Sequence, residues 1–367
     1  MSRVLCALAL ALAMIACTRR ELTYSYQPTV SVAITADWSD MSEAPTGMSI
    51  YCYPESGAAP TIVQTNNTAE ATVSLAEGVY SILIFNQIPS DYGTVSFSGM
   101  DSFESASIGA ISAETLQALK SDSDDTIRDP EEVAAEIYLG LEITADQVMQ
   151  SIELKSKGTT KTEDLIAASL EFTPQVVLKT THVKIKVLGV GNFYSATGKL
   201  YGMATGYNFS QQRSHDDMCS HLLEEWSSST TDDSSTEGEI SISFDCFGLP
   251  GQTSSSVVGD YAEWDGVLDL DITLVDQSTT ISESITLGDK LTATSSNTSS
   301  EASRADDFDT EASMDVSVDI SITSGYGLSG EDEPISLPDV VPAGSTSGGF
   351  DATVAGWGDE QQVDLML

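Results

Sequence analysis

The densest group of residues able to do chemistry is the stretch HDDMCSH, which holds His215, Asp216, Asp217, Cys219 and His221. Imidazole nitrogens and thiolates are zinc ligands, so residues this close together could supply part of a zinc site. A tetrahedral structural site also needs further ligands, and the sequence offers no second ligand pair elsewhere. We therefore predict an acidic loop with incidental histidines, and no metal.

Other catalytic signatures are absent from the sequence. It contains no HExxH zinc motif, no GxSxG nucleophile motif, no phosphate-binding loop and no GxGxxG dinucleotide motif. The acidic stretch DSDDTIRDPEE lacks the central glycine of an EF-hand calcium loop, so we read it as a solvated loop. The sequence therefore predicts a protein that is not an enzyme and binds no cofactor.

The N-terminus has the pattern of a secretory signal. Arg3 precedes an uncharged run of thirteen residues, 4–16, rich in Leu and Ala. A membrane-spanning helix needs about 20 apolar residues, so this run is too short to be one. The run ends in MIAC, which resembles the bacterial lipobox, where a lipid is joined to the cysteine and the signal is cut just before it. An ordinary signal peptide with a chance cysteine is the alternative.

We predict a lipoprotein signal peptide at 1–16 and a lipidated linker at 17–28 that begins at Cys17. The 351-residue body has no other apolar stretch of spanning length, so lipid on Cys17 would be its attachment to a membrane. Three cysteines then remain, Cys52, Cys219 and Cys246. Cys219 and Cys246 are a candidate disulfide, and two buried thiols are the equally weighted alternative.

Charge excludes one class of partner. The chain has 15 Lys and Arg against 56 Asp and Glu, a formal net charge of -41. Nucleic-acid binding requires the opposite sign, so we predict no nucleic-acid partner. Apolar residues make up 41% of the chain, which argues against global disorder.

Alternation of apolar and polar residues recurs along the chain and is typical of strands with one buried face. It occurs in TVSVAIT, HVKIKVLG, EISISFDCFG, GVLDLDITLVD, MDVSVDISI and the final QQVDLML. ATVSLAEGVYSILIF is predicted to be a hairpin with its turn at Glu77 and Gly78. Helices are predicted at SAETLQALKS and at DPEEVAAEIYL, where Asp129 and Glu132 could form a capping box. The fold class is mainly β and antiparallel, with short helical insertions in the first half.

Several short motifs resemble the fimbrillin-like lipoproteins of the Bacteroidales. They are the opening CTRRELTYSY with VSVAITADW, the segment TPQVVLKTTHVKIKVLGVGNF, and later FDCFGLPG, LDITLVDQSTT and AGWGDEQQVDLML. Within that group the chain is most similar to a domain family of unknown function, with a more distant likeness to FimB-type anchor subunits of fimbriae. The resemblance implies two tandem transthyretin-like β-sandwich domains. With a boundary near Pro174, we place them at 29–174 and 175–367.

The resemblance also implies a function. Polymerising fimbrillins are trimmed after an arginine well inside the mature chain, which opens a groove for a partner's strand. Here Arg19 and Arg20 follow Cys17 directly, and the next arginine is Arg128. A non-enzymatic, lipid-anchored anchor or accessory subunit of a fimbria-like structure therefore fits better than a shaft subunit. We expect it at the outer membrane, on the periplasmic or the exposed side, with fimbrial subunits as partners by strand exchange, for which the terminal strand at 361–367 is a candidate.

Two further features belong to the same prediction. Trp226 and Trp264 stand in polar surroundings, which favours the alternative function of a glycan-binding surface lipoprotein. Asp125-Thr126-Ile127 resembles the acceptor triplet for O-glycosylation in this bacterial phylum, so Thr126 is a candidate glycosylation site in a loop.

Overall fold

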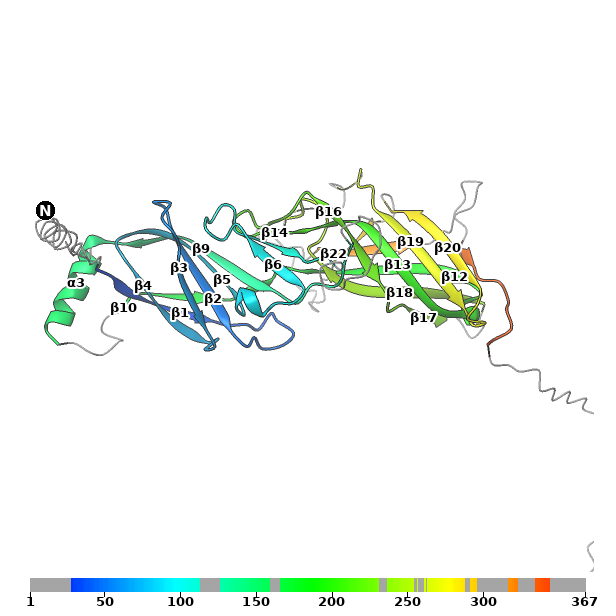
Figure 1. Cartoon of the computed structure of the whole chain (residues 1–367), viewed down its shortest axis with the longest axis horizontal. Helices are drawn as coiled ribbons and strands as arrows, with labels where there is room; N and C mark the ends of the chain where they lie inside the picture. Colours follow the sequence, from blue (N-terminus) through cyan, green and yellow to red (C-terminus); the bar gives the residue numbers. More distant parts are fainter. Residues whose placement is uncertain are drawn as a thin grey trace, which may run out of the picture.

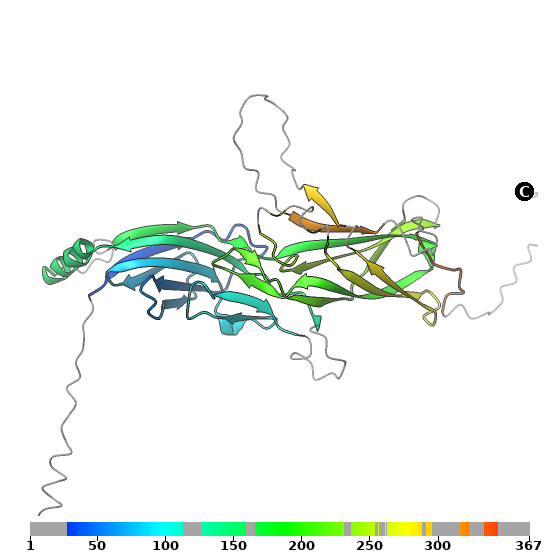
Figure 2. The same ribbon diagram turned by 90° about the horizontal axis from the view of Figure 1, so that it is seen from above.

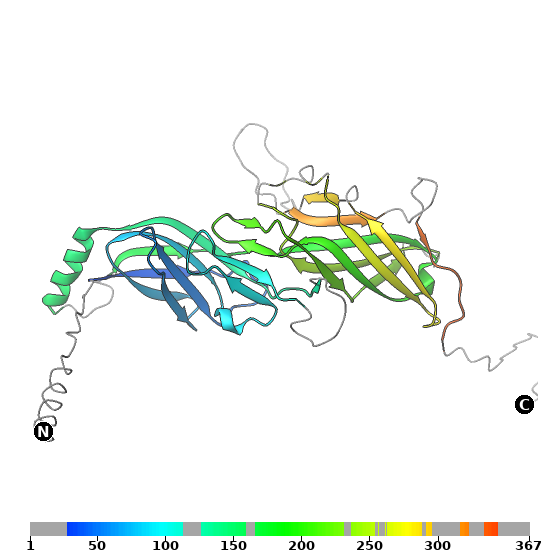
Figure 3. The ribbon, with the colours of Figure 1, turned by 45° about the horizontal axis from the view of Figure 1, so that its top comes forward.

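The computed structural model describes residues 28–112, 126–158, 166–230, 236–253, 256, 261, 263–287, 291–295, 316–322 and 334–343. Within these ranges the protein is mostly β, which confirms the predicted fold class. Two groups of sheets lie end to end along one long axis, and the blue strands belong to the N-terminal group and the yellow and orange strands to the C-terminal group (Figures 1 and 3).

The N-terminal part is built from two sheets that face each other. Sheet A has the order β10-β1-β4 and sheet B the order β11-β9-β5-β2-β3. Their strands are β1 (Val30–Ala36), β2 (Met48–Pro54), β3 (Thr61–Thr65), β4 (Glu70–Leu75), β5 (Gly78–Asn86), β9 (Ala134–Ile143), β10 (Ile166–Phe172) and β11 (Gln175–Val176). The predicted inward residues of β1, Val30, Val32 and Ile34, are at most 1% exposed and share one apolar cluster with Ile50, Ile82 and Ile84 of sheet B.

The predicted hairpin at 71–85 is wrong in its pairing, although both strands exist. β4 pairs with β1 in sheet A, whereas β5 pairs with β2 and β9 in sheet B. The turn before Gly78 therefore carries the chain from one layer of the sandwich to the other. β5 is buried on both of its faces, so its apolar run SILIF contacts two different cores.

The predicted helix at 129–139 is also wrong, because strand β9 begins at Ala134 and pairs with β5. Glu131 and Glu132 do not cap a helix. Glu131 accepts hydrogen bonds from the backbone N–H groups of Gly93 and Thr94, and Glu132 accepts from Ser42. The α-helix that the structure describes is α3 (Ala145–Ser156), directly after β9, and it begins with a capping box between Thr144 and Gln147. The other predicted helix, at 112–121, lies outside the described residues apart from its first residue.

The C-terminal part is a second pair of facing sheets. Sheet D has the order β20-β19-β13-β16-β8, and sheet E has the order β17-β18-β12-β22-β21, with β23 beside β12. Their strands are β8 (Thr126–Ile127), β12 (Lys179–Leu188), β13 (Phe193–Ala204), β16 (Met218–Leu223), β17 (Ser227–Thr230), β18 (Glu237–Cys246), β19 (Val267–Leu274), β20 (Thr280–Thr286), β21 (Leu291–Ser295), β22 (Val316–Ile322) and β23 (Ile335–Ser336). Val183, Ile185 and Val187 face this core as predicted, and Lys184 and Lys186 face outward.

A further sheet, sheet C, contains two strands from each half of the chain, in the order β15-β14-β7-β6. Strands β6 (Val95–Ser98) and β7 (Ser107–Ala110) precede residue 174, whereas β14 (Gly206–Asn208) and β15 (Arg213–Ser214) follow it. In addition, β8 pairs with β16 of sheet D. Strands therefore cross the predicted boundary in both directions, and the domain ranges 29–174 and 175–367 stay a prediction.

Candidate functional site

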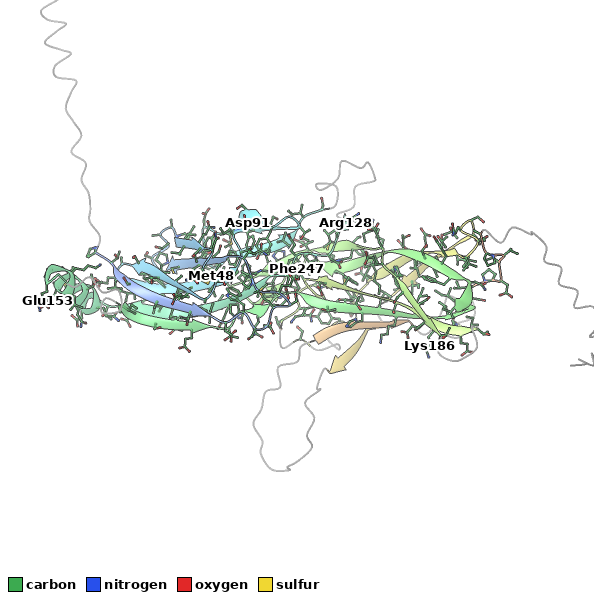
Figure 4. All side chains as sticks on the ribbon, turned by 90° about the horizontal axis from the view of Figure 1, so that it is seen from below. Met48, Asp91, Arg128, Glu153, Lys186 and Phe247 are labelled. Atoms are coloured by element: carbon green, nitrogen blue, oxygen red, sulfur yellow. The ribbon has the colours of Figure 1, made fainter. Side chains whose placement is uncertain are left out.

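The two halves meet at an apolar core that we call the junction core. It lies between sheet C and the outer face of sheet B, and Phe247 of the C-terminal half belongs to it. Figure 4 labels Phe247 near the middle of the long axis. The rings of Phe85, Phe97 and Phe209 stack here, with centroids 4.7 Å apart for Phe85 and Phe97 and 6.2 Å apart for Phe97 and Phe209. Because these rings come from both sides of residue 174, each half completes the other's packing.

A cavity of about 290 Å³ opens beside this core, and we call it the junction pocket. Its volume is near the lower end of small-molecule pockets. Five segments of the chain meet there: the loop after β1, the start of β9, the crossing segment between β10 and β12, the β14–β15 hairpin and the loop after β18. The lining residues are Asp40, Ala135, Glu136, Gln175, Val176, Val177, Lys179, Tyr207, Gln212, Ser214, Gln252 and Thr253.

Two carboxylates of the pocket fix the crossing segment. One oxygen of Asp40, Oδ2, accepts a hydrogen bond from the backbone N–H of Val176 at 2.8 Å. Oε2 of Glu136 accepts from the backbone N–H of Thr173. The second oxygen of each carboxylate has no hydrogen bond among the described residues, so each can accept one from a ligand.

The other polar groups of the pocket are mostly uncharged. Gln252 is 2% exposed, its Oε1 accepts from the backbone N–H of Leu249 at 2.8 Å, and its Nε2 has no partner among the described residues. Burial raises the pKa of Tyr207 to about 12, so its phenol stays protonated and can donate. Gln212, between β14 and β15, also lines the pocket and has a left-handed backbone with φ 49°. This mixture of carboxylates, amides and hydroxyls suits a ligand rich in hydroxyl groups.

A second cavity, of about 320 Å³, is lined mainly by segments around β16 and β18 and is acidic. Among its lining residues are Asp129, Glu224, Glu225 and Arg128, and Arg128 lies 3.6 Å from Glu224 in an exposed ion pair. Asp129 is exposed by its accessible surface, but partial desolvation within the cavity, followed by the neighbouring charge of Asp245, raises its pKa to about 6. The cavity is therefore a poor place for a further anion.

The residues of the HDDMCSH stretch do not converge. Its second half is strand β16, not a loop, which corrects that part of the prediction. Asp216 pairs with Arg213, and Nδ1 of His215 lies 3.3 Å from Oγ1 of Thr205. His221 is fully buried with its ring 5.0 Å from that of Phe244, and both of its nitrogens lack a partner among the described residues. No group of three potential metal ligands occurs in the described ranges.

Cys219 and Cys246 are buried free thiols in the structure and form no disulfide with each other. Of the two alternatives, the structure therefore has the pair of buried thiols and not the bridge. The Cys219 thiol donates to the carbonyl of Met203, and the Cys246 thiol lies 3.3 Å from Oγ1 of Thr181. Each thiol therefore has a local partner in its own sheet, sheet D for Cys219 and sheet E for Cys246.

The remaining predicted site residues have different outcomes. Cys17 and the signal at 1–16 lie outside the described residues, as does the closing segment 361–367. Among the helices that the structure describes, none combines the length and apolar character needed to span a membrane. Thr126 is half-buried in strand β8 and pairs with Ser220, so it is not in a loop as expected. It stays a prediction as a glycosylation site.

The tryptophans do not form a binding surface. Trp264 is 8% exposed, and its Nε1 donates to the carbonyl of Gly202 at 2.8 Å. Trp226 packs against the same core and donates to the carbonyl of Leu223 at 3.2 Å. The expected surface role is therefore wrong for Trp264, which is buried, whereas Trp226 is half-buried against the core. The junction pocket, which sequence analysis missed, is assembled from segments with more than 200 residues between the first and the last, and no local motif marks it.

Comparison with known proteins gives one family and a group of similar folds. Residues 16–224 match the family described as "Domain of unknown function (DUF5119)". A candidate adhesin from Bacteroides ovatus is 16% identical, with 74% of this chain and 87% of that chain covered and a TM-score of 0.51. A candidate polysaccharide-binding protein from Bacteroides thetaiotaomicron is 9% identical, covering 80% and 89% at a TM-score of 0.41.

The fimbrial anchor protein Mfa2 from Porphyromonas gingivalis is 13% identical, with 66% of this chain and 77% of that chain covered and a TM-score of 0.37. At such identities a likeness concerns the fold alone. No curated protein matches the chain.

Proposed function

This chain belongs to the DUF5119 family, and on that premise we propose that it is a non-enzymatic, lipid-anchored component of a fimbria-like or adhesin-like structure at the outer membrane. The observation that carries the proposal is the fold shared with the candidate adhesin of Bacteroides ovatus, at a TM-score of 0.51. The lipobox-like stretch that ends at Cys17 supports the anchor.

Among the described residues, one histidine and one serine lie close enough to act as a base and a nucleophile, but their surroundings support a non-enzymatic role. Nδ1 of His182 lies 2.6 Å from Oγ of Ser243, a distance that would suit a nucleophile and its base. Ser243 lines the acidic cavity, together with Asp129 and two glutamates. Acyl transfer by a serine needs donors that stabilise an oxyanion, and carboxylates do the opposite. The pair is better explained as a cross-strand contact between β12 and β18.

The anchor is tested by cell fractionation of Cys17→Ala. We expect the variant to leave the membrane fraction and to lose incorporation of labelled fatty acid, because a single attachment point would be gone. Cys6→Ala is the matched control, since it changes a cysteine of the same apolar run and should stay lipidated. A Cys17→Ala protein that remains membrane-bound would overturn the anchor. Protease shaving of intact cells then decides between the periplasmic and the exposed side.

Fimbrial subunits are the proposed partners, joined by strand exchange through 361–367. Deleting this segment should abolish co-purification with a polymerising fimbrillin and leave the melting temperature unchanged. A lower melting temperature would instead show that the segment closes the protein's own sheet. If the full-length protein captures no fimbrial subunit, the partnership is refuted.

A second function is favoured by the junction pocket. Its carboxylates, amides and neutral Tyr207 phenol suit the hydroxyl groups of a saccharide. We expect Gln212→Ala and Asp40→Ala to reduce binding on a glycan array. Trp226→Ala serves as the control, because that ring packs on the core and should not affect binding. This alternative would be removed if the wild type bound no glycan, or if Gln212→Ala and Asp40→Ala bound as well as the wild type.

A further inference from the structure

Helix α3 lies at one end of the long axis, beside the place where the described chain begins. Nζ of Lys155, in the last turn of α3, donates to the carbonyl of Thr29, one residue before β1. Figures 1 and 2 show the helix protruding beyond the sheets at this end. In Figure 4, Glu153 of α3 and Lys186 of β12 are labelled near opposite ends of the molecule. The N-terminal linker therefore enters the molecule at the α3 end.

The length of the linker limits how far this end can be from a lipid on Cys17. Eleven residues, 17–27, separate the predicted lipid from the first described residue. A fully extended chain spans at most about 3.5 Å per residue, so the linker reaches no further than roughly 40 Å. Given the proposed function, a lipid on Cys17 keeps the α3 end as the part of the body closest to the membrane.

The outward side of α3 carries apolar side chains. Met149 is 64% exposed and Ile152 is 38% exposed, and their spacing of three residues puts them on the same side of the helix. Val148 and Ser151, at 5% and 4% exposed, face the body instead. A surface helix normally turns its apolar side to the core, so Met149 and Ile152 indicate a contact on the outer side.

Basic residues occur at this end beside the acidic Asp146 and Glu153 of the same helix. Lys155 lies in the last turn of α3, Lys157 follows the helix and pairs with Glu153 at 2.5 Å, and Arg19 and Arg20 follow Cys17 in the sequence. Together these are four of the 15 basic residues in a chain with a net charge of -41. Cations beside an apolar pair are typical of a helix that rests on anionic headgroups.

We propose that α3 lies against the membrane that holds Cys17, with Met149 and Ile152 in the headgroup region and Lys155 beside lipid phosphates. The contact is too small to hold the protein on the membrane without its lipid, and it directs the long axis of the anchored protein away from the bilayer. The two sheets of the C-terminal part are then held farthest from the surface.

Hydrogen exchange on vesicles tests this contact without depending on natural lipidation. The chain from Cys17 to Leu367 is coupled through the Cys17 thiol to a maleimide lipid in vesicles of phosphatidylethanolamine and phosphatidylglycerol. The other thiols are buried, and burial raises the pKa of Cys52 to about 12 and that of Cys246 to about 11, so they should not react. We expect the amides of α3 to exchange about tenfold more slowly than in the uncoupled chain, because opening must also break the lipid contact.

Two controls make the result decisive. Peptides around Tyr194, a residue of β13 that is 55% exposed, should exchange at the same rate in both samples. The double variant Met149→Glu with Ile152→Glu should remain coupled but lose the protection of α3. Unprotected α3 amides in the coupled wild type, or protection that survives the double variant, would overturn the membrane contact. Neither outcome affects the proposed lipidation, which the Cys17→Ala fractionation tests separately.

Discussion

His221 allows the most quantitative prediction, because the core around it has no place for a charge. The residue is 0% exposed on β16, and neither ring nitrogen has a hydrogen-bond partner among the described residues. Burial lowers the pKa of His221 from its ordinary 6.5 to about 3. The folded protein therefore keeps a neutral imidazole at pH values where the unfolded chain is protonated.

The sign and size of the effect follow from this difference. Between pH 3 and pH 6.5 the unfolded chain binds one more proton at His221 than the folded chain, so the free energy of unfolding falls as the pH falls. Each pH unit well inside that window removes about 1.4 kcal/mol. Lowering the pH from 7 to 5 should therefore cost about 2 kcal/mol through His221.

The test is urea unfolding of wild type and His221→Leu at pH 7 and pH 5. At pH 7 the variant should be about as stable as wild type, because the lost contact with Phe244 is offset by removal of two buried nitrogens without partners. At pH 5 it should exceed wild type by about 2 kcal/mol.

Ile185→Val is the control, since loss of one buried methylene from the same core should cost about 1 kcal/mol at both pH values. If wild type and His221→Leu lose the same stability between pH 7 and pH 5, the reasoning about His221 is refuted.

Three other substitutions test the junction and the C-terminal core. Asp129→Asn should raise the melting temperature more at pH 7.5 than at pH 4, because the raised pKa of Asp129, about 6, means that ionisation above that pH destabilises the fold; equal gains at both would refute this. Gly206→Ala should cost about 1–3 kcal/mol in urea unfolding, since the added Cβ would meet the backbone oxygen of Ile108, whereas Gly93→Ala, with more space, should have little effect. Trp264→Ala should cost about 3–5 kcal/mol by the same assay, and a near-neutral result would contradict its burial.

Local sequence patterns were sufficient to predict the strands with one buried face and the residues that point inward. In β1 and β12 every second residue is apolar, and the structure buries Val32 and Val183 at 0% exposure. Alternation with a period of two follows from the backbone of a single strand, so it can be read without knowing the partner strand. The expected kinship with a domain family of unknown function is likewise confirmed, because it depends on residue types along the chain.

Pairing and burial depended on residues far apart in sequence. The segment 129–139 has apolar spacing that permits a helix, but β5 supplies a long partner strand and β9 forms instead. The capping box of Thr144 and Gln147 was a local signal for α3 that the same stretch of sequence already contained. Periodicity cannot choose between a helix and a strand when the competing hydrogen bonds come from a strand about 50 residues away.

By itself, therefore, the amino-acid sequence determined the mainly β character, the inward faces of the regular strands, the strong negative charge and the candidate anchor at Cys17. Only the tertiary structure decided that β4 and β5 belong to different sheets, that sheet C joins the two halves, and that Trp264 and His221 are buried. The physical reason is that strand periodicity and net charge are properties of neighbouring residues or of the composition. Sheet order, burial and the junction pocket arise when segments as distant as Asp40 and Gln252 are brought together by the shared packing of both halves.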